Sequence, residues 1–271
     1  MTHTRRLFLG FPAMLAAQNI LELPPPKDGE HIAYGSDQFQ FGELRVPAGA
    51  GPHPVVIVIH GGYWRAAYDL KHIGHLCAAV TAAGFATWSM EYRRLGNAGG
   101  GWPCTFDDIR AGAAHLNKIA KEKKLDLARV VATGHSAGGH LVLWLAKQKA
   151  VPLRGVVPLA PVADLRRAFE LRLSGRVVGE LLGGSPEQYP DRYRAASPPE
   201  MLPLGVKQRV IHGIDDNIVP LSISRGYVEA ARAKGDDATL NELRGAGHFE
   251  VIDPRSAAWP AVRDALKSLA G

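Results

Sequence analysis

Hydrophobic and polar positions along the chain fall into two patterns. Residues 38–46 alternate between polar and apolar positions, which is typical of a strand with one face in solvent. Residues 55–59, in contrast, read VVIVI, an unbroken run of β-branched side chains. Such a run predicts a strand that is buried on both faces, as in a parallel sheet. From this strand onward, strand-like and helix-like segments are expected to alternate.

The same reasoning predicts the other elements of the chain. Gly84 follows the first predicted helix, and Asp107 and Asp108 lie in the first turn of the second, where the helix dipole favours their charge. The predicted strands are residues 38–46, 55–59, 85–92, 129–133, 155–160, 210–212 and 239–243, and the predicted helices are residues 68–83, 107–123, 136–149, 222–234 and 254–269.

This alternation predicts an α/β fold, with a doubly wound, mostly parallel sheet and helices on both of its faces. We expect one domain over residues 31–271, preceded by a linker at residues 18–30 that contains three consecutive prolines. Residues 161–205 break the rhythm and are rich in Arg, Pro and Gly, with a short helical piece at 177–182. They predict a lid-like excursion over the top of the sheet without a second core.

Composition excludes several classes of protein. The chain has 271 residues, of which 46% are hydrophobic and 21% charged, so it can bury a sizeable core without disulfides or metals. The mean hydropathy is -0.07, and no apolar run approaches the roughly 18 residues of a membrane span. The net charge of +6 comes from dispersed basic residues, so we expect neither a nucleic-acid partner nor membrane association. The sequence carries no signal for the oligomeric state.

The first 17 residues resemble an export signal. Arg5 and Arg6 are followed by Phe8 and a short apolar stretch that ends at Ala17, as in twin-arginine signals. This pattern predicts a periplasmic or secreted protein. The alternative is a cytoplasmic protein with a basic N-terminus.

The two cysteines do not suggest a metal site. Cys77 lies in a helical apolar pattern and is expected to be a small buried hydrophobe, whereas Cys104 follows a glycine-rich loop. Two isolated cysteines match no zinc spacing, so we expect no bound metal. A disulfide between them is the alternative in an oxidising compartment.

The segment GHSAG at residues 134–138 is the leading candidate for a nucleophile site. It matches the pattern G-x-S-x-G and lies between a predicted strand and a predicted helix. A tight turn there raises the side chain of Ser136 above the sheet, and the helix that follows offers backbone N–H groups to developing negative charge. The alternative is a glycine-rich helix start that Ser136 merely caps.

A serine nucleophile needs a general base. His248 follows the predicted strand 239–243 in the segment GAGHF, and it therefore lies at the end of the sheet where catalytic residues gather. His248 is the expected base.

The base in turn needs an acid that orients it. Asp216 stands four residues after His212 in the pattern H-G-x-x-D-x-x-V-P and is the preferred acid, with the neighbouring Asp215 as second choice. Asp164, after the strand 155–160, is a third candidate, for which capping of the next helical turn is the stronger interpretation.

The segment HGGYW at residues 60–64 directly follows the buried strand 55–59. Its two glycines let the backbone approach a substrate closely and direct N–H groups at it. We expect the N–H groups of Gly62 and Tyr63, together with that of Ala137, to form an oxyanion hole. The alternative is a plain β-turn. His60 is expected to be a structural hydrogen-bonding residue.

Aromatic side chains near these segments are candidates for substrate binding. Trp64 follows the oxyanion segment, Trp102 follows three glycines, and Phe249 is next to the base. For Trp64 the alternative is packing beneath the loop. Four arginines of the excursion would attract an anionic substrate, although ordinary surface charge is the simpler interpretation: Arg166, Arg167, Arg172 and Arg176.

The order of these parts resembles the α/β-hydrolase family over residues 30–271. The HGGYW form is similar to the esterase/lipase branch that includes kynurenine formamidases, which carry H-G-G-x-W, and feruloyl and acetyl esterases. It departs from the H-G-G-G form of another branch, because Tyr63 replaces the third glycine.

The resemblance implies a serine hydrolase that cleaves small carboxylic esters or formyl amides through an acyl-enzyme, with no metal and no cofactor. A binding protein that has lost its catalytic residues is a remote alternative, because Ser136, Asp216 and His248 are all present. A nucleotide-binding α/β protein is disfavoured, since no G-x-G-x-x-G follows the first strand.

Overall fold

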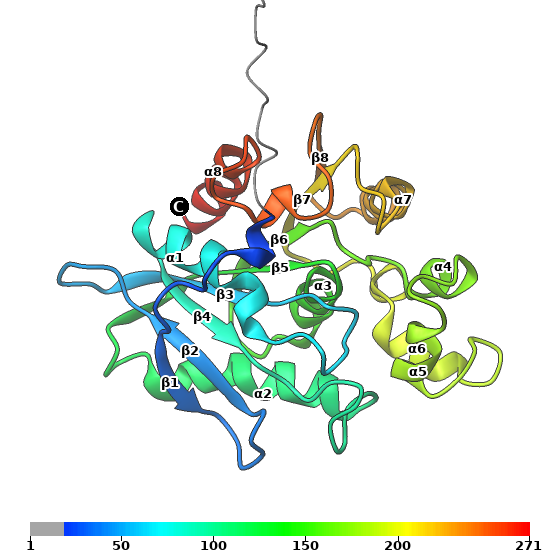
Figure 1. Ribbon diagram of the computed structural model, residues 1–271, viewed down its shortest axis with the longest axis horizontal. Coiled ribbons are helices and arrows are strands. Elements are labelled where there is room, and N and C mark those ends of the chain that lie inside the picture. The colour runs from blue at the N-terminus through cyan, green and yellow to red at the C-terminus, as the bar shows by residue number, and fades with distance from the viewer. Residues whose placement is uncertain (1–18) are drawn as a thin grey trace, which may run out of the picture.

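An eight-stranded sheet forms the centre of the structure, a computed structural model that describes residues 19–271 (Figure 1). The strand order is β1-β2-β4-β3-β5-β6-β7-β8. The pairs β1–β2 and β2–β4 are antiparallel, and the other pairs are parallel. The strands are β1 (Glu30–Ala33), β2 (Phe41–Arg45), β3 (His53–Ile59), β4 (Ala86–Met90), β5 (Leu125–His135), β6 (Leu153–Leu159), β7 (Lys207–Gly213) and β8 (Ala238–Leu243).

Helices connect the parallel strands. The α-helices are α1 (Gly74–Ala82), α2 (Cys104–Ile119), α3 (Ala137–Gln148), α4 (Leu165–Glu170), α5 (Val177–Leu182), α6 (Pro190–Ala196), α7 (Leu221–Ala233) and α8 (Trp259–Ala270). The short 3-10 helices are η1 (Ile20–Glu22), η2 (Leu70–Ile73), η3 (Pro198–Met201) and η4 (Glu250–Ile252).

Two apolar clusters lie on opposite faces of the sheet. In β3, Val55, Ile57 and Ile59 belong to the cluster that α2, α3 and α7 cover, while Val56 and Val58 belong to the cluster that α1 and α8 cover. In Figure 1, α1 and α8 accordingly lie above the sheet and α2 below it. The two-faced burial explains the unbroken apolar run of this strand. The predicted α/β fold with a mostly parallel sheet is confirmed.

The N-terminal part differs most from the sequence-based expectation. The sequence predicts a linker at residues 18–30, but Glu30 begins the edge strand β1, and Ile20 in η1 is buried. The expected helix 68–83 is divided into η2 and α1. The expected export signal lies outside the described residues, so it stays a prediction. Within residues 19–271 no helix is long and apolar enough to cross a membrane.

The excursion at residues 161–205 contains α4, α5 and α6, which gather at the right of Figure 1. The apolar side chains of α5 point inward, and Val177, Val178, Leu181 and Leu182 are all buried in the cluster shared with α3. The segment therefore packs as part of the core.

Both cysteines are free. Cys77 is fully buried in the cluster under α1, as expected, and Cys104 begins α2. The disulfide alternative is not realised in the structure.

A buried carboxylate fastens α2 to the sheet. Asp108 accepts hydrogen bonds from Arg93 Nε at 2.8 Å, from Arg93 Nη2 at 2.6 Å and from Gln40 Nε2 at 2.8 Å. Its side chain is only 1% exposed. Arg93 follows β4 and Gln40 precedes β2, so three segments meet at one carboxylate.

We expect Asp108→Asn to lower the free energy of unfolding by about 3 kcal/mol, because it leaves a largely buried guanidinium without its partner. Asp107→Asn is the matched control, since Asp107 makes an exposed pair with Arg110 that is worth less than about 1 kcal/mol. Urea unfolding followed by circular dichroism measures both changes. Equal losses in the two variants would contradict this account.

Candidate active site

Ser136 occupies the sharp turn between β5 and α3. Its backbone angles are φ 56° and ψ -116°, a strained conformation for a residue with a side chain. Three backbone hydrogen bonds hold it there: Ser136 N donates to the Leu159 carbonyl of β6 at 2.8 Å, and Ser136 O accepts from His140 N at 3.1 Å and from Val162 N at 3.2 Å. The Ser136 side chain caps no N–H group of α3, so the role of helix cap is excluded.

The glycines around Ser136 are required by close backbone packing. A Cβ on Gly134 would lie 2.5 Å from the Gly138 carbonyl oxygen, and a Cβ on Gly138 would collide with the Ile59 carbonyl oxygen of β3. Glycine is therefore required at the first and last positions of the G-x-S-x-G pattern, because α3 begins too close to β3 and β5 to leave room for a side chain there.

Asp216 and His248 are brought together from the ends of β7 and β8. His248 Nδ1 donates to Asp216 Oδ2 at 2.6 Å, and the Asp216 side chain is fully buried. Asp216 Oδ1 accepts from the backbone N–H groups of Ile218 and Val219, both at 2.8 Å. Since Nδ1 is bound to Asp216, Nε2 is the nitrogen of His248 that is left for proton transfer.

A second histidine supports the acid. His212 Nε2 lies 3.1 Å from Asp216 Oδ2 and 3.0 Å from the Val219 carbonyl oxygen, while His212 Nδ1 accepts from Ser224 at 2.8 Å. Burial by itself would raise the pKa of Asp216, but the hydrogen bonds from His212 and His248 outweigh it and hold that pKa well below its usual range. Asp216 is therefore ionised at neutral pH.

The sequence interpretation used His212 only to locate the acid and missed this supporting role. The sequence feature that could have indicated this role is the spacing of four residues between His212 and Asp216. The other candidate acids do not reach the base: Asp215 is exposed, and Asp164 caps α4 by accepting from Arg167 N at 3.0 Å.

Ser136 follows β5, whereas Asp216 and His248 follow β7 and β8, and β6 lies between β5 and β7 in the sheet. The ring of His135, the residue before the nucleophile, has its centroid 4.4 Å from the ring centroid of His248. Within residues 19–271, no hydrogen bond joins the Ser136 hydroxyl to His248. Such catalytic hydrogen bonds often become short only when substrate is bound.

The backbone at residues 60–64 has the conformation that an oxyanion hole needs. Gly62 and Tyr63 have φ angles of 102° and 53°, which direct successive N–H groups to one side. A Cβ on Gly62 would lie 2.6 Å from the Tyr68 ring, so only glycine fits there. Within residues 19–271, the N–H groups of Gly62, Tyr63 and Ala137 have no backbone acceptor. All three remain available to bind an anion.

A buried hydrogen bond between two side chains supports this loop from below. His60 Nε2 lies 3.0 Å from Glu91 Oε1, and the Tyr92 hydroxyl donates to the His60 carbonyl at 3.1 Å. Glu91 also accepts from Tyr92 N at 2.8 Å. His60 is thus the structural residue that the sequence indicated, while its partner Glu91 carried no motif that would have singled it out.

The two tryptophans lie on the α2 and α3 side of the sheet. Trp64 has no exposed surface and packs edge-on against His140 at 5.3 Å between ring centroids. The expectation that Trp64 lines an open pocket is therefore corrected: it packs beneath the loop. Trp102 is half-buried against Phe106, and its backbone N–H donates to the Leu181 carbonyl of α5 at 2.8 Å.

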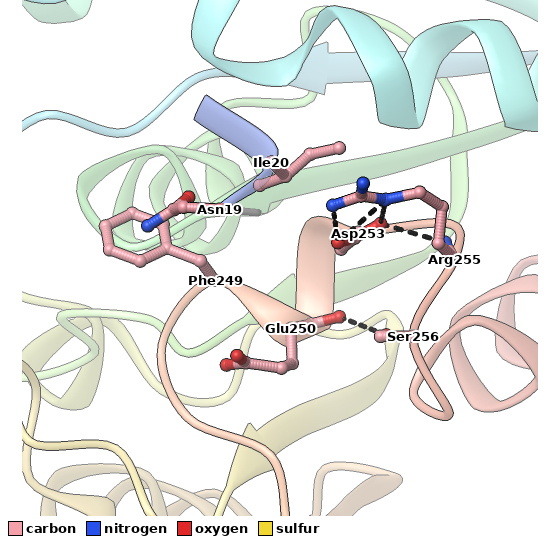
Figure 2. Close-up of a pocket in the computed structure, with 7 residues that line it drawn as sticks. All are labelled: Asn19, Ile20, Phe249, Glu250, Asp253, Arg255 and Ser256. Carbon is pink, nitrogen blue, oxygen red and sulfur yellow. Dashed lines mark hydrogen bonds and ion pairs between the residues drawn. The ribbon is translucent and has the colours of Figure 1, made fainter. Parts of the chain in front are cut away.

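Phe249 lies on the other side of the base loop, in contact with His72, His135 and His248. It also lines a pocket of about 380 Å³, in which Figure 2 shows its ring beside Asn19. Asp253 and Arg255 form an ion pair there at 2.7 Å. The pocket is lined by Asn19, Ile20, Phe249, Glu250, Asp253, Arg255 and Ser256, and thus by neither Ser136 nor His248.

Two of the four arginines considered as anion-binding candidates are engaged in ion pairs. Arg166 pairs with Glu200, and Arg167 pairs with Glu170 at 2.8 Å. Arg172 and Arg176 are exposed. Among residues 19–271, no group of three or more His, Cys, Asp or Glu side chains is arranged to hold a metal ion.

A strained serine between β5 and α3, an aspartate after β7 that pairs with a histidine after β8, and a sheet with two antiparallel pairs at one edge define an α/β-hydrolase. The chain belongs to the BD-FAE family, whose model matches residues 44–230. The predicted resemblance to α/β-hydrolases of the esterase branch is confirmed. The matched region contains Ser136 and Asp216 but ends before His248.

Individual relatives agree with this class. The chain is 25% identical to Esterase LipC of Mycobacterium tuberculosis over 244 residues, which cover 82% of this chain and 60% of LipC. It is 22% identical to kynurenine formamidase of Drosophila melanogaster over 239 residues, covering 83% and 75% of the two chains. A truncated carbohydrate esterase from gut microbiota has the same fold, with a TM-score of 0.78, 20% identity and coverage of 91% and 97%.

Gly213 provides a test of how the base is placed. It ends β7, and a Cβ there would lie 2.5 Å from the Gly247 carbonyl oxygen and closer still to that of Ala246. Gly213→Ala should therefore displace the loop that carries His248. A displacement of about 1 Å can cost on the order of 100-fold in rate, so we expect covalent labelling of Ser136 by a fluorophosphonate to slow by about that factor.

Gly226→Ala is the matched control, because nothing lies within 4 Å of a Cβ at that helical position. It should keep the labelling rate of the unmodified protein. Unchanged labelling in Gly213→Ala, at an unchanged melting temperature, would show that the loop position does not depend on this contact.

Proposed function

We propose that this protein is a serine hydrolase that cleaves small carboxylic esters through an acyl-enzyme on Ser136. The observation that carries the proposal is the 2.6 Å hydrogen bond from His248 Nδ1 to a buried Asp216 carboxylate, next to a serine in a strained turn. A buried carboxylate that orients a histidine is the arrangement by which a serine hydroxyl is activated.

In the proposed first step, the Ser136 hydroxyl oxygen attacks the ester carbonyl carbon while His248 Nε2 accepts the hydroxyl proton. Asp216 keeps Nδ1–H as the donor tautomer and stabilises the imidazolium that forms. The N–H groups of Gly62, Tyr63 and Ala137 donate to the carbonyl oxygen as it becomes negative. His248 then protonates the departing alkoxide, and the alcohol leaves.

In the second step, water replaces the alcohol. His248 accepts a proton from the water, whose oxygen attacks the acyl carbon, and the same oxyanion hole binds the second tetrahedral intermediate. Collapse of that intermediate returns the proton to Ser136 and releases the carboxylic acid. All proton transfers in this scheme are made by protein groups and the attacking water.

The surface of the excursion at residues 161–205 supports the proposal that the substrates are small. Interfacial lipases need a large exposed apolar patch near the site, whereas the apolar residues of α5 are buried. The exposed large hydrophobic side chains are scattered, and only Leu171 and Tyr189 belong to the excursion. A second candidate activity is the hydrolysis of N-formyl amides, which the similarity to kynurenine formamidase favours.

The triad assignment predicts distinct losses for neighbouring residues. Ser136→Ala should lower kcat by roughly 1000-fold or more with the fold intact. Asp216→Asn should lower it by about 100- to 10000-fold, because asparagine favours the wrong tautomer of the base. Asp215→Asn is the control and should change kcat less than about 2-fold, as expected for an exposed side chain outside the hydrogen-bond network. Kinetics with p-nitrophenyl butyrate measure all three, and the reverse ranking of the two aspartates would refute the assignment.

The substrate class is tested by kcat/KM over two series. The kcat/KM of esters with acyl chains of two to about six carbons should exceed that of twelve-carbon esters by at least about 10-fold, because α5 buries the apolar side chains that could otherwise bind a longer chain. The best ester should also exceed N-formylkynurenine, since esters are the more reactive carbonyls. A maximum at long chains would instead make the protein a lipase, and a formamide value ten times that of the best ester would make it a formamidase.

A further inference from the structure

Two histidines outside the triad, the buried His135 and the half-buried His72, form a chain of hydrogen bonds that ends at the backbone of the base. His135 Nε2 lies 2.8 Å from the His248 carbonyl oxygen, and His135 Nδ1 lies 2.8 Å from His72 Nε2. The rings of His72 and His135 are stacked, with centroids 5.0 Å apart. His72 comes from η2 and His135 from the last position of β5, so the chain joins three separate segments.

The chemistry of the groups determines the direction of each hydrogen bond. A carbonyl oxygen can only accept, so His135 Nε2 must carry the hydrogen. In a neutral imidazole the other nitrogen is then an acceptor, and His72 Nε2 must donate to His135 Nδ1. The chain therefore runs from His72 through His135 to the His248 carbonyl, and each ring is held as a single tautomer.

Both rings are neutral at the pH at which a hydrolase of this kind works. Burial, assisted by the charges of His60 and His248, lowers the pKa of His72 to about 3. Burial likewise lowers the pKa of His135 well below its usual value, with His248 and His72 adding to the effect. This chain from His72 through His135 to the His248 carbonyl, which we call the histidine relay, thus brings no second positive charge next to the imidazolium that His248 becomes during the reaction.

The hydrogen bond between His72 Nε2 and His135 Nδ1 lies against the oxyanion loop, residues 60–64. A Cβ on Gly61 would be 3.2 Å from both His135 Nδ1 and His72 Nε2, and 2.9 Å from the His135 carbonyl oxygen. His135 is also the residue directly before Ser136. The two rings therefore lie where three segments meet: the oxyanion loop at Gly61, the turn at Ser136 and the loop that carries His248.

We infer that His72 and His135 are positioning residues, which fix the backbone of His248 relative to Ser136 and the oxyanion loop for ester hydrolysis. This inference rests on the proposed function of Ser136 and His248. The relay acts on the main chain of the base, whereas Asp216 acts on its ring. The base is thereby held at two points, and neither hydrogen bond alone would fix both its place and its orientation.

The experiment compares a conservative and a disruptive substitution at each histidine. Glutamine keeps a terminal N–H donor at His135 for the His248 carbonyl and at His72 for His135 Nδ1, whereas leucine removes it. His75→Gln is the matched control, because His75 lies three residues after His72 at the start of α1 and takes no part in the chain. The readouts are kcat and KM for p-nitrophenyl butyrate and the far-downfield proton resonance of the His248–Asp216 hydrogen bond.

We expect His135→Leu to lower kcat by about 10- to 100-fold while KM changes less than about 2-fold, as for a small displacement of a reacting group. His135→Gln should recover most of that loss. At His72, leucine should again lower kcat more than glutamine does, but both losses should be smaller, since His72 acts through His135. The downfield resonance should move or broaden in the leucine variants and persist in the glutamine variants and in His75→Gln.

Equal losses in the glutamine and leucine variants, a change in KM alone, or an unaltered resonance in His135→Leu would overturn the relay. Should His135→Leu fail to fold, the His72 pair makes the same comparison. Absence of Ser136-dependent ester hydrolysis in the unmodified protein would refute the proposed function instead. In that case the resonance still tests the relay, because it needs no substrate.

Discussion

The contact between the start of α3 and the end of β3 is the constraint on which the rest of the site depends. Gly138 lies so close to the Ile59 carbonyl oxygen that no side chain fits between them. Ser136 turns through a positive φ where the helix begins, and Gly138 also lies close to the His60 carbonyl oxygen of the loop that follows β3. One backbone contact thus brings together Ser136 and the loop that we propose as nucleophile and oxyanion hole.

Around that contact, polar side chains at the carboxyl ends of the strands are held in pairs. Glu91 holds His60, His212 holds Asp216, and His135 holds the backbone of His248. Buried polar groups need such partners, because an unpaired one costs the free energy of its lost hydration. The partners also restrict motion, so a site made of loops acquires the rigidity of the sheet beneath it.

Several side chains that the sequence suggested for substrate binding are used in packing or in ion pairs instead. Trp64 looks from its position like a pocket residue, but its side chain fills the space between the oxyanion loop and His140. The excursion likewise buries its apolar residues against α3, and its arginines Arg166 and Arg167 are paired with neighbouring glutamates. Two of the arginines at this surface are therefore matched by carboxylates of the same segment.

The sequence by itself determined the class of fold and the succession of strands and helices along the chain, and it singled out Ser136, Asp216 and His248 as the candidate site, because these depend on local rules. An apolar run forms a buried strand, and a glycine pair flanking serine permits only a tight turn. It missed β1 and the residues His72, Glu91 and His212, and it misplaced Trp64. Those depend on which segments meet in space, since β1 acquires its pairing only from β2, and a histidine acquires a role only from the group that faces it. That information exists only once the chain is folded.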